Sequence, residues 1–256
     1  MKNQSYAAMN QALSKVPELT LVFWIIKILA TTLGETGGDA VSMSMDLGYL
    51  VSTGIFAVLF IAAVVVQIAS QKFHPVIYWL TIVASTTVGT TLADFATRSL
   101  GIGYAGGSAL LLLLLLGSLF MWKQVTGSVA VEGVCSPRSE YFYWVTIMFS
   151  QTLGTALGDW TADTAGLGYL GAAAIFAGLL LVVVAAYFWT KASRTMLFWI
   201  AFILTRPLGA VVGDFLDKPL ANGGLELSRY TATAVLAVAI AACVLLIPQR
   251  AAQKTH

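Results

Sequence analysis

The sequence GETGGDAVSMSMD, at residues 34–46, places three carboxylates beside a run that is apolar enough to enter a bilayer. The acids are Glu35, Asp39 and Asp46, and the preceding run is LTLVFWIIKILATTL. Burying a charge in a membrane is costly, so intramembrane acids usually mark an ion or proton pathway. Carboxylates are also hard oxygen ligands, which bind Mn²⁺, Mg²⁺ and Ca²⁺ better than they bind thiophilic metals. The stretch is therefore a candidate site for a bound cation.

The whole chain has the composition of an integral membrane protein. It has 256 residues, of which 58% are hydrophobic and 10% are charged, against about 25% charged in soluble domains. Eight apolar runs have the length of a membrane span, about 17–25 residues. They cover residues 19–38, 50–69, 76–95, 105–122, 142–160, 170–189, 197–214 and 230–247. The predicted fold class is all-α integral membrane, with eight transmembrane helices.

A fourfold repeat runs through these spans. The pattern W-x9-G-x3-[GA]-D begins at Trp24, Trp79, Trp144 and Trp199. Its aspartates are Asp39, Asp94, Asp159 and Asp214. Each repeat holds two spans, so all four repeats insert in the same orientation, and the glycine pairs of the pattern let helices approach closely. We predict four tandem two-helix repeats whose odd-numbered helices form a central bundle, with the more uniformly apolar even-numbered helices facing lipid.

The repeat also divides the chain. Residues 1–18 are polar and are expected to form a cytoplasmic N-terminal segment. The two membrane halves, of two repeats each, are 19–122 and 142–247; a cytoplasmic linker (123–141) joins them, and 248–256 is a C-terminal tail. Nine basic residues fall on the side of the termini and three on the other side, an excess that marks the cytoplasmic side. We therefore expect a multi-pass protein of the bacterial inner membrane with both termini in the cytoplasm.

The spacing within a repeat indicates how deep the acids lie. Tryptophan near a helix end is most often an anchor at the membrane interface. At 1.5 Å per residue, the aspartate fifteen residues on lies roughly 22 Å into a hydrocarbon core of about 30 Å. Glu35, eleven residues after Trp24, lies roughly 16 Å in, near the midplane. At about 100° per residue the acids share one face with small and polar residues, so we expect them to point toward a common interior.

The predicted substrate-binding residues are the acids of this face. They are Glu35, Asp39, Asp94, Asp159, Asp163 and Asp214. Each of them except Asp163 is also a predicted metal ligand. Lys27 and Arg206 lie on the same face and are expected to balance charge. Five acids against two bases leave three net negative charges, which cations or protons must compensate. Asp46 follows the helix and is expected in solvent.

These features predict a secondary transporter for a divalent metal cation, with Mn²⁺ export coupled to protons as its specific form. Carboxylates that hold metal and protons in turn couple the two, since metal binding releases protons. One alternative is a pseudo-fourfold cation channel. Another is a transporter of a small organic cation, for which Phe95 and Trp160, beside two of the aspartates, supply aromatic surface. No paired nucleophile and base indicates an enzyme.

The expected partners are the lipid bilayer, the transported metal ion and protons. A net charge of +2 is too small to favour nucleic acid. No nucleotide-binding motif is present, which argues against ATP-driven pumping within this chain. No cofactor other than the transported ion is expected, and the sequence leaves the oligomeric state and the direction of transport open.

The four two-helix repeats, each opened by a tryptophan, resemble a bacterial integral-membrane family of unknown function that is built from four such tandem repeats. The stretch KVPELTLVFWIIKILATTLGETGGD, at residues 15–39, is especially similar to that family's first repeat, and the resemblance implies the eight-helix architecture. Separately, GETGGD is similar to the Glu-x-Gly-Asp-[Lys/Arg]-[Ser/Thr] signature of Gdt1-like manganese and calcium exchangers, in which paired acidic motifs bind the cation. Glu35 and Asp39 match its acids, although an extra glycine intervenes and the Lys-Thr continuation is missing.

Overall fold

The computed structural model describes residues 14–253, and within this range every regular element is helical. Eight of these helices are long. They are α2 (Leu21–Asp39), α3 (Gly48–Ala69), α4 (Pro75–Asp94), α5 (Tyr104–Thr126), α6 (Pro137–Asp159), α7 (Gly168–Trp189), α8 (Arg194–Asp217) and α9 (Arg229–Leu246). The predicted all-α class with two helices per repeat is confirmed.

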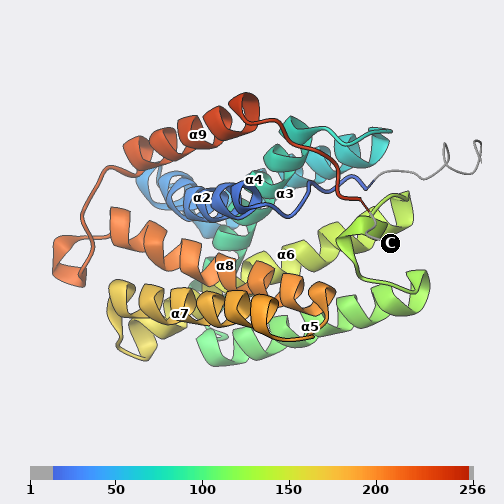
Figure 1. Cartoon of the computed structure of the whole chain (residues 1–256). Coiled ribbons are helices and arrows are strands. Elements are labelled where there is room, and N and C mark those ends of the chain that lie inside the picture. Colours follow the sequence, from blue (N-terminus) through green and yellow to red (C-terminus); the bar gives the residue numbers. More distant parts are fainter. Residues whose placement is uncertain (1–13, 254–256) are drawn as a thin grey trace, which may run out of the picture.

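The helices form an inner ring and an outer layer (Figure 1). The inner helices α2, α4, α6 and α8 open the four repeats and contact one another in cyclic order, so that α8 packs back against α2. The second helix of each repeat packs on the first helix of the next one: α3 on α4, α5 on α6, α7 on α8, and α9 on α2. The predicted central bundle of odd-numbered helices is therefore confirmed, and the repeats are arranged around an axis through its centre.

Seven of the long helices in residues 14–253 are both long and apolar enough to cross a membrane. The eighth, α6, has 23 residues but a lower hydropathy. Its polar side chains Ser150, Gln151 and Thr155 are completely buried in the bundle. Because protein rather than lipid surrounds these side chains, a polar helix is tolerated there. The structure supports a multi-pass membrane protein.

Glycines ten residues after each repeat tryptophan lie where the inner helices cross. A Cβ atom added at Gly34 would lie 2.1 Å from Thr86 Oγ1 on α4, and one at Gly209 would lie 2.1 Å from Thr31 Oγ1 on α2. The glycines of the second and third repeats meet the following inner helix in the same way. These positions have no room for a side chain, because the neighbouring backbone is almost in contact.

Three inner helices do not end at their aspartate but continue as a five-residue π-helical turn. These turns are Ala40–Ser44, Phe95–Ser99 and Trp160–Thr164. In the fourth repeat α8 instead continues to Asp217, and a short 3₁₀ helix, Leu220–Asn222, follows. A π-helical turn is rare and frequently lies at a functional site. Here the turns carry the chain across the end of the bundle opposite the termini, which we call the outer end.

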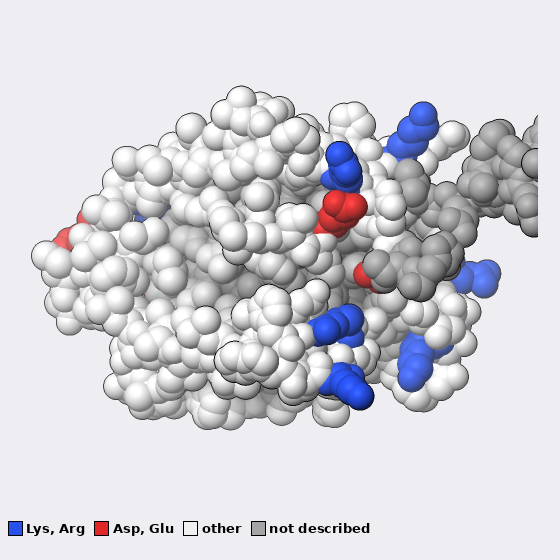
Figure 2. All heavy atoms as spheres, viewed as in Figure 1, with Lys and Arg blue, Asp and Glu red and all other residues white. Residues whose placement is uncertain are grey.

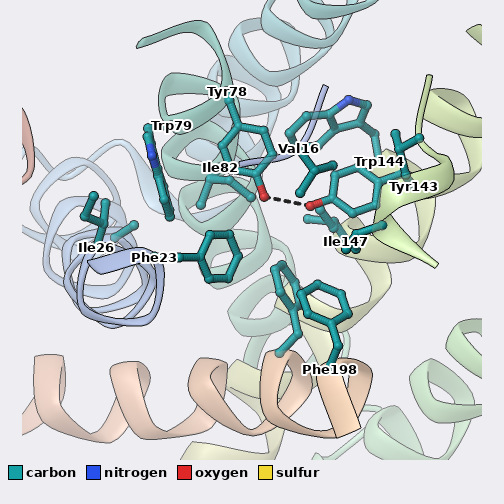
Figure 3. Packing of buried hydrophobic residues seen from close by; sticks show 14 of the residues in the cluster. Val16, Phe23, Ile26, Tyr78, Trp79, Ile82, Tyr143, Trp144, Ile147 and Phe198 are labelled. Atoms are coloured by element: carbon teal, nitrogen blue, oxygen red, sulfur yellow. Dashed lines mark hydrogen bonds between the residues drawn. The ribbon is translucent and has the colours of Figure 1, made fainter. Parts of the chain in front are cut away.

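An aromatic cluster closes the axis at the end of the bundle that carries the termini. It consists of the four residues that precede the repeat tryptophans: Phe23, Tyr78, Tyr143 and Phe198. Figure 3 shows them gathered from the four inner helices, and a hydrogen bond of 2.7 Å joins the hydroxyl groups of Tyr78 and Tyr143. All four side chains are buried, so this end of the axis is packed with protein.

The expected anchoring of the repeat tryptophans at the lipid interface is wrong for three of the four. Trp79, Trp144 and Trp199 are only 2%, 2% and 4% exposed, and Trp24 is half-buried. They belong to the apolar core around the aromatic cluster. The indole N–H of Trp79 donates a hydrogen bond to the Gln249 side chain (2.7 Å), and that of Trp199 donates to the Val129 carbonyl oxygen (3.0 Å). Segments outside the inner helices therefore cover these rings.

Three short segments, which we call the terminal cap, cover the aromatic cluster. They are residues 14–18, 129–135 and 249–252. Backbone hydrogen bonds join the first to the other two, from Lys15 to Val134 (2.8 Å) and from Glu18 to Arg250 (2.9 Å). The Lys15 ammonium also pairs with Glu140 at 2.7 Å. Basic side chains gather at this same end in Figure 2. The rest of the predicted N-terminal segment and tail, 1–13 and 254–256, lies outside the described residues.

Candidate functional site

Positions at equal distance from the repeat tryptophan lie at the same level along the axis. Fifteen residues on is a ring of buried aspartates, the aspartate ring: Asp39, Asp94, Asp159 and Asp214. One turn nearer the terminal cap are Glu35, Thr90, Thr155 and Ala210. One turn nearer the outer end is a second ring, the mouth ring: Met43, Arg98, Asp163 and Lys218. Charged side chains are thus stacked in successive layers on one axis.

The aspartate ring and Glu35 bring carboxylates together inside the bundle. Three sets of three acids each have one oxygen atom per residue within 4.8 Å of one another. The sets are Glu35, Asp159, Asp214; Glu35, Asp39, Asp94; and Asp39, Asp214, Asp217. All five predicted metal ligands therefore meet in one place, with Asp217 added, and we call these six acids the cage. Oxygen atoms at this spacing can converge on a single hard cation, whose ligand distances are about 2.0–2.6 Å.

Two oxygen atoms of the aspartate ring have neither a hydrogen-bond partner nor an ion pair among residues 14–253. Asp39 Oδ1 and Asp159 Oδ1 are buried and accept no hydrogen bond from any residue between 14 and 253. A buried carboxylate oxygen without a donor is destabilising, because it has lost its hydrogen bonds to water and no protein donor replaces them. These atoms are available to a cation in the cage.

Two residues of the mouth ring reach back to the aspartate ring. Arg98 Nε lies 3.0 Å from Asp94, and its Nη2 lies 3.1 Å from Asp159 on the next inner helix. Lys218 pairs with Asp39 and lies 3.1 Å from Asp214. Each base thus joins aspartates of two different repeats.

The expectation of three net negative charges in the interior is wrong. Arg98, Lys218 and Arg229 are loop residues in the sequence, yet all three contact buried acids, Arg229 through Asp217 at 3.0 Å. The second π-helical turn directs Arg98, and the end of α8 directs Lys218, back over the ring, while Arg229 is the first residue of α9. Glu35, the ring and Asp217 supply six negative charges, and the four bases that pair with them, Arg98, Arg206, Lys218 and Arg229, supply four positive ones.

The positive charge on Lys218 is firmly held. Lys218 follows the last residue of α8, outside the membrane-spanning helix. Burial lowers its pKa, but the carboxylates of Asp214, Asp39 and Asp217 outweigh burial and raise the pKa well above its usual value. Lys218 is therefore a permanent cation at the mouth of the site.

Arg206 fills the axis between the aspartate ring and the terminal cap. Its side chain is completely buried, and its Nη2 donates to Glu35 Oε2 at 3.0 Å. The same nitrogen lies 2.5 Å from the hydroxyl oxygens of both Thr90 and Thr155, so its two N–H groups are shared among three acceptors. The guanidinium thus contacts the other three inner helices at once. Its predicted role as a counter-charge agrees with this geometry.

Lys27, the second base expected to balance the acids, does not pair with any of them. Lys27 forms no ion pair within the described part of the chain; its amine lies 3.4 Å from Gln151 Oε1 and 4.2 Å above the Phe202 ring. It is two turns nearer the terminal cap than Glu35, too far to reach the carboxylates. Asp163 is also separate from the cage, because it is exposed at the mouth rather than turned into the ring.

A cavity of about 590 Å³ opens onto the ring from the outer end. All four residues of the mouth ring line it, together with Asp214 from the aspartate ring. In the opposite direction the axis is filled, first by Arg206, then by Ile82, Ile147 and Phe202, which are all fully buried, and then by the aromatic cluster. The site is reached from one side only in this state.

The sequence matches the family described as a repeat of unknown function (DUF347) four times, at residues 22–73, 77–127, 142–193 and 197–248. The chain belongs to this family. The four DUF347 repeats coincide with the helix pairs α2–α3, α4–α5, α6–α7 and α8–α9. No curated protein and no solved structure matches the chain. The family description supplies no activity, and the similarity of GETGGD to cation exchangers stays a prediction.

Sequence reasoning missed four charged residues of this DUF347 protein's site: Arg98, Asp217, Lys218 and Arg229. A signal for two of them was present, because Arg98 and Lys218 each follow a repeat aspartate by four residues, the spacing at which helical side chains meet. No comparable local pattern indicates Arg229, whose partner Asp217 lies across a loop.

Proposed function

We propose that this DUF347 protein is a secondary transporter for a divalent metal cation, and that Glu35 and the aspartate ring bind the ion. Mn²⁺ export in exchange for protons is the specific form to test first. The observation that carries the proposal is the cage itself: sets of buried carboxylate oxygens within 4.8 Å of one another, below a cavity open to one side. Acids at membrane depth are rare and mark substrate or ion pathways.

The composition of the cage favours a hard divalent ion. Its ligands are carboxylates, with threonine hydroxyl groups beside them, and neither cysteine belongs to it. Mn²⁺, Mg²⁺ and Ca²⁺ take such oxygen ligands, whereas soft metals select thiolates. Two or three carboxylates carry enough negative charge to compensate a doubly charged ion after it loses its water.

Arg98 and Lys218 act as tethered counter-ions for the empty cage. A buried carboxylate that loses its only cation is strongly destabilised, so an empty cage needs positive charge from the protein. An entering metal ion competes for the same oxygens and displaces the two side chains into the cavity that they already line. Arg98 has room for this movement, since its side chain is 32% exposed. When the ion leaves, the bases return.

The filled axis favours a carrier over a channel. Arg206 and the apolar layers below it leave no continuous path between the two ends of the bundle, so passage requires a conformational change, as in alternating access. The organic-cation alternative has less support, because Trp160 is 41% exposed rather than packed at the cage. The basic side chains around the termini favour a cytoplasmic location for that end, in the bacterial inner membrane.

The test is Mn²⁺ uptake into proteoliposomes across a pH gradient, with Ca²⁺ and Mg²⁺ as competitors. Asp39→Asn and Asp159→Asn keep size and hydrogen bonding but remove charge, and each leaves the paired base a second carboxylate, Asp214 for Lys218 and Asp94 for Arg98. The protein should therefore fold, while uptake falls by about tenfold or more, which corresponds to about 1.4 kcal/mol of binding free energy. Asp46→Asn is the matched control, since Asp46 is exposed beyond α2. Unchanged uptake in both cage variants, or no cation flux in the parent, would refute metal transport.

A further inference from the structure

Lys27 differs from every other basic side chain in the interior. Within residues 14–253, the other bases that reach into the bundle each lie within 3.1 Å of a carboxylate oxygen: Lys15, Arg98, Arg206, Lys218 and Arg229. Lys27 has no carboxylate partner there, although its side chain is completely buried. The site described above does not use it.

The surroundings of the Lys27 amine are nearly apolar. Its hydrogen-bond acceptor is Gln151 Oε1, at the long distance of 3.4 Å, and the Phe202 ring lies 4.2 Å away. Gln151 is held in place through its amide, which donates to Ser85 Oγ at 3.3 Å. An ammonium has three N–H donors and would leave most of its hydration unreplaced here. A neutral amine loses far less, so this position favours the neutral amine over the ammonium.

The charged residue next to Lys27 along the axis is Arg206 on α8, which is buried one helical turn nearer the cage. At the level of Lys27, α4 and α6 present the uncharged side chains Ile82 and Ile147, and Gln151 of α6 lies one turn nearer the cage. Arg206 lies between Lys27 and the carboxylate cage, because its guanidinium bonds Glu35 at the far end. A positive charge on Lys27 therefore acts on the cage through a second positive charge, and like charges in a low-dielectric interior repel strongly.

We propose that the Nζ atom of Lys27 is the proton-binding site that couples this protein to a pH gradient, a role that rests on the proposed transport function. The neutral amine takes up one proton and becomes an ammonium, with no other bond made or broken. The ammonium repels Arg206 toward Glu35, which adds positive charge at the cage and weakens metal binding. By linkage, a bound metal ion weakens proton binding at Lys27 to the same extent. Because the bound metal ion and the bound proton disfavour each other, the protein exchanges one for the other.

The transport test separates coupling from metal binding. Lys27→Met removes the titratable group and keeps most of the side-chain volume. In proteoliposomes it should retain Mn²⁺/Mn²⁺ exchange without a gradient, while Mn²⁺ accumulation driven by a pH gradient falls by about tenfold or more, within the range of ordinary coupling energies. Ile82→Met places the same side chain at the same level on α4 and should preserve both activities. Accumulation at the parent level in Lys27→Met would overturn the proposal.

A second measurement does not depend on transport. If Lys27 exchanges a proton in the folded protein near neutral pH, the melting temperature of the parent in detergent should rise relative to that of Lys27→Met between about pH 6 and pH 9, because the unfolded lysine stays protonated throughout. A difference that is constant over this range would refute the proton site. If the difference varies but the parent carries no metal ion, the transport function is wrong and the proton site remains.

Discussion

The contact between Gly34 on α2 and Thr86 on α4 gives a direct test of the inner ring. A Cβ atom added at Gly34 would lie 2.1 Å from Thr86 Oγ1, 2.5 Å from its Cβ and 3.0 Å from its backbone carbonyl carbon. Carbon atoms pack at about 3.5–4.0 Å, so Gly34→Ala requires α2 and α4 to separate by about 1 Å. Rotation of a side chain cannot relieve the overlap, because two of the atoms belong to the Cβ and the backbone.

Overpacking of this kind costs about 1–3 kcal/mol, and the close backbone contact favours the upper end of that range. For a chain of this size, 1 kcal/mol shifts the melting temperature by about 2–4 °C. We therefore expect Gly34→Ala to melt about 6–12 °C below the parent in detergent. The assay is thermal unfolding followed by tryptophan fluorescence or by loss of the monodisperse peak in size-exclusion chromatography.

Two controls make this test specific. Gly54→Ala lies on the outer helix α3, where an added Cβ has nothing within 4 Å, and it should melt close to the parent. The double variant Gly34→Ala, Thr86→Gly moves the small residue to the other helix and should recover at least about half of the lost stability, since coupled neighbours are non-additive. If Gly34→Ala melts within about 2 °C of Gly54→Ala, the inner helices are not packed as described.

Three further predictions follow from other parts of the molecule. Tyr78→Phe and Tyr143→Phe should each lower the free energy of unfolding by about 1–3 kcal/mol, because the partner hydroxyl is left buried and unpaired. The double variant should lose less than the sum of the two, and additive losses in thermal melts would refute the hydrogen bond. Single cysteines can be placed at the exposed positions Ser128 and Ala221 in a background without the native cysteines. They should react with an impermeant maleimide from opposite sides of the membrane, and labelling of both from outside would overturn the topology. Asp163→Asn should change Mn²⁺ uptake by less than about twofold, because Asp163 is exposed to solvent and belongs to none of the converging sets of carboxylates. A loss as large as that of Asp159→Asn would place Asp163 in the site.

The sequence alone determined the architecture of this protein. Hydropathy and length are sufficient for membrane spans, since a span must satisfy its backbone internally and face an apolar solvent. The repeat pattern then assigned two helices to each unit and the odd-numbered ones to the centre, because only they carry glycine and acid on one face. The fixed 100° rotation per residue also predicted that Glu35 and the four repeat aspartates would share that face, and the structure brings all of them within one cage.

Only the tertiary structure decided how the acids are balanced and where the axis is closed. Periodicity predicts the face on which a side chain lies, but it contains no information about which residue of another helix lies opposite. Arg98 contacts Asp159 on α6, and Arg206 contacts Glu35 on α2, at sequence separations of 61 and 171 residues. The burial of the repeat tryptophans likewise depends on the terminal cap, which is assembled from three distant segments. Charge balance and closure of the axis are properties of the assembled ring, because each arises from contacts that exist only after α8 and α9 have packed back on α2.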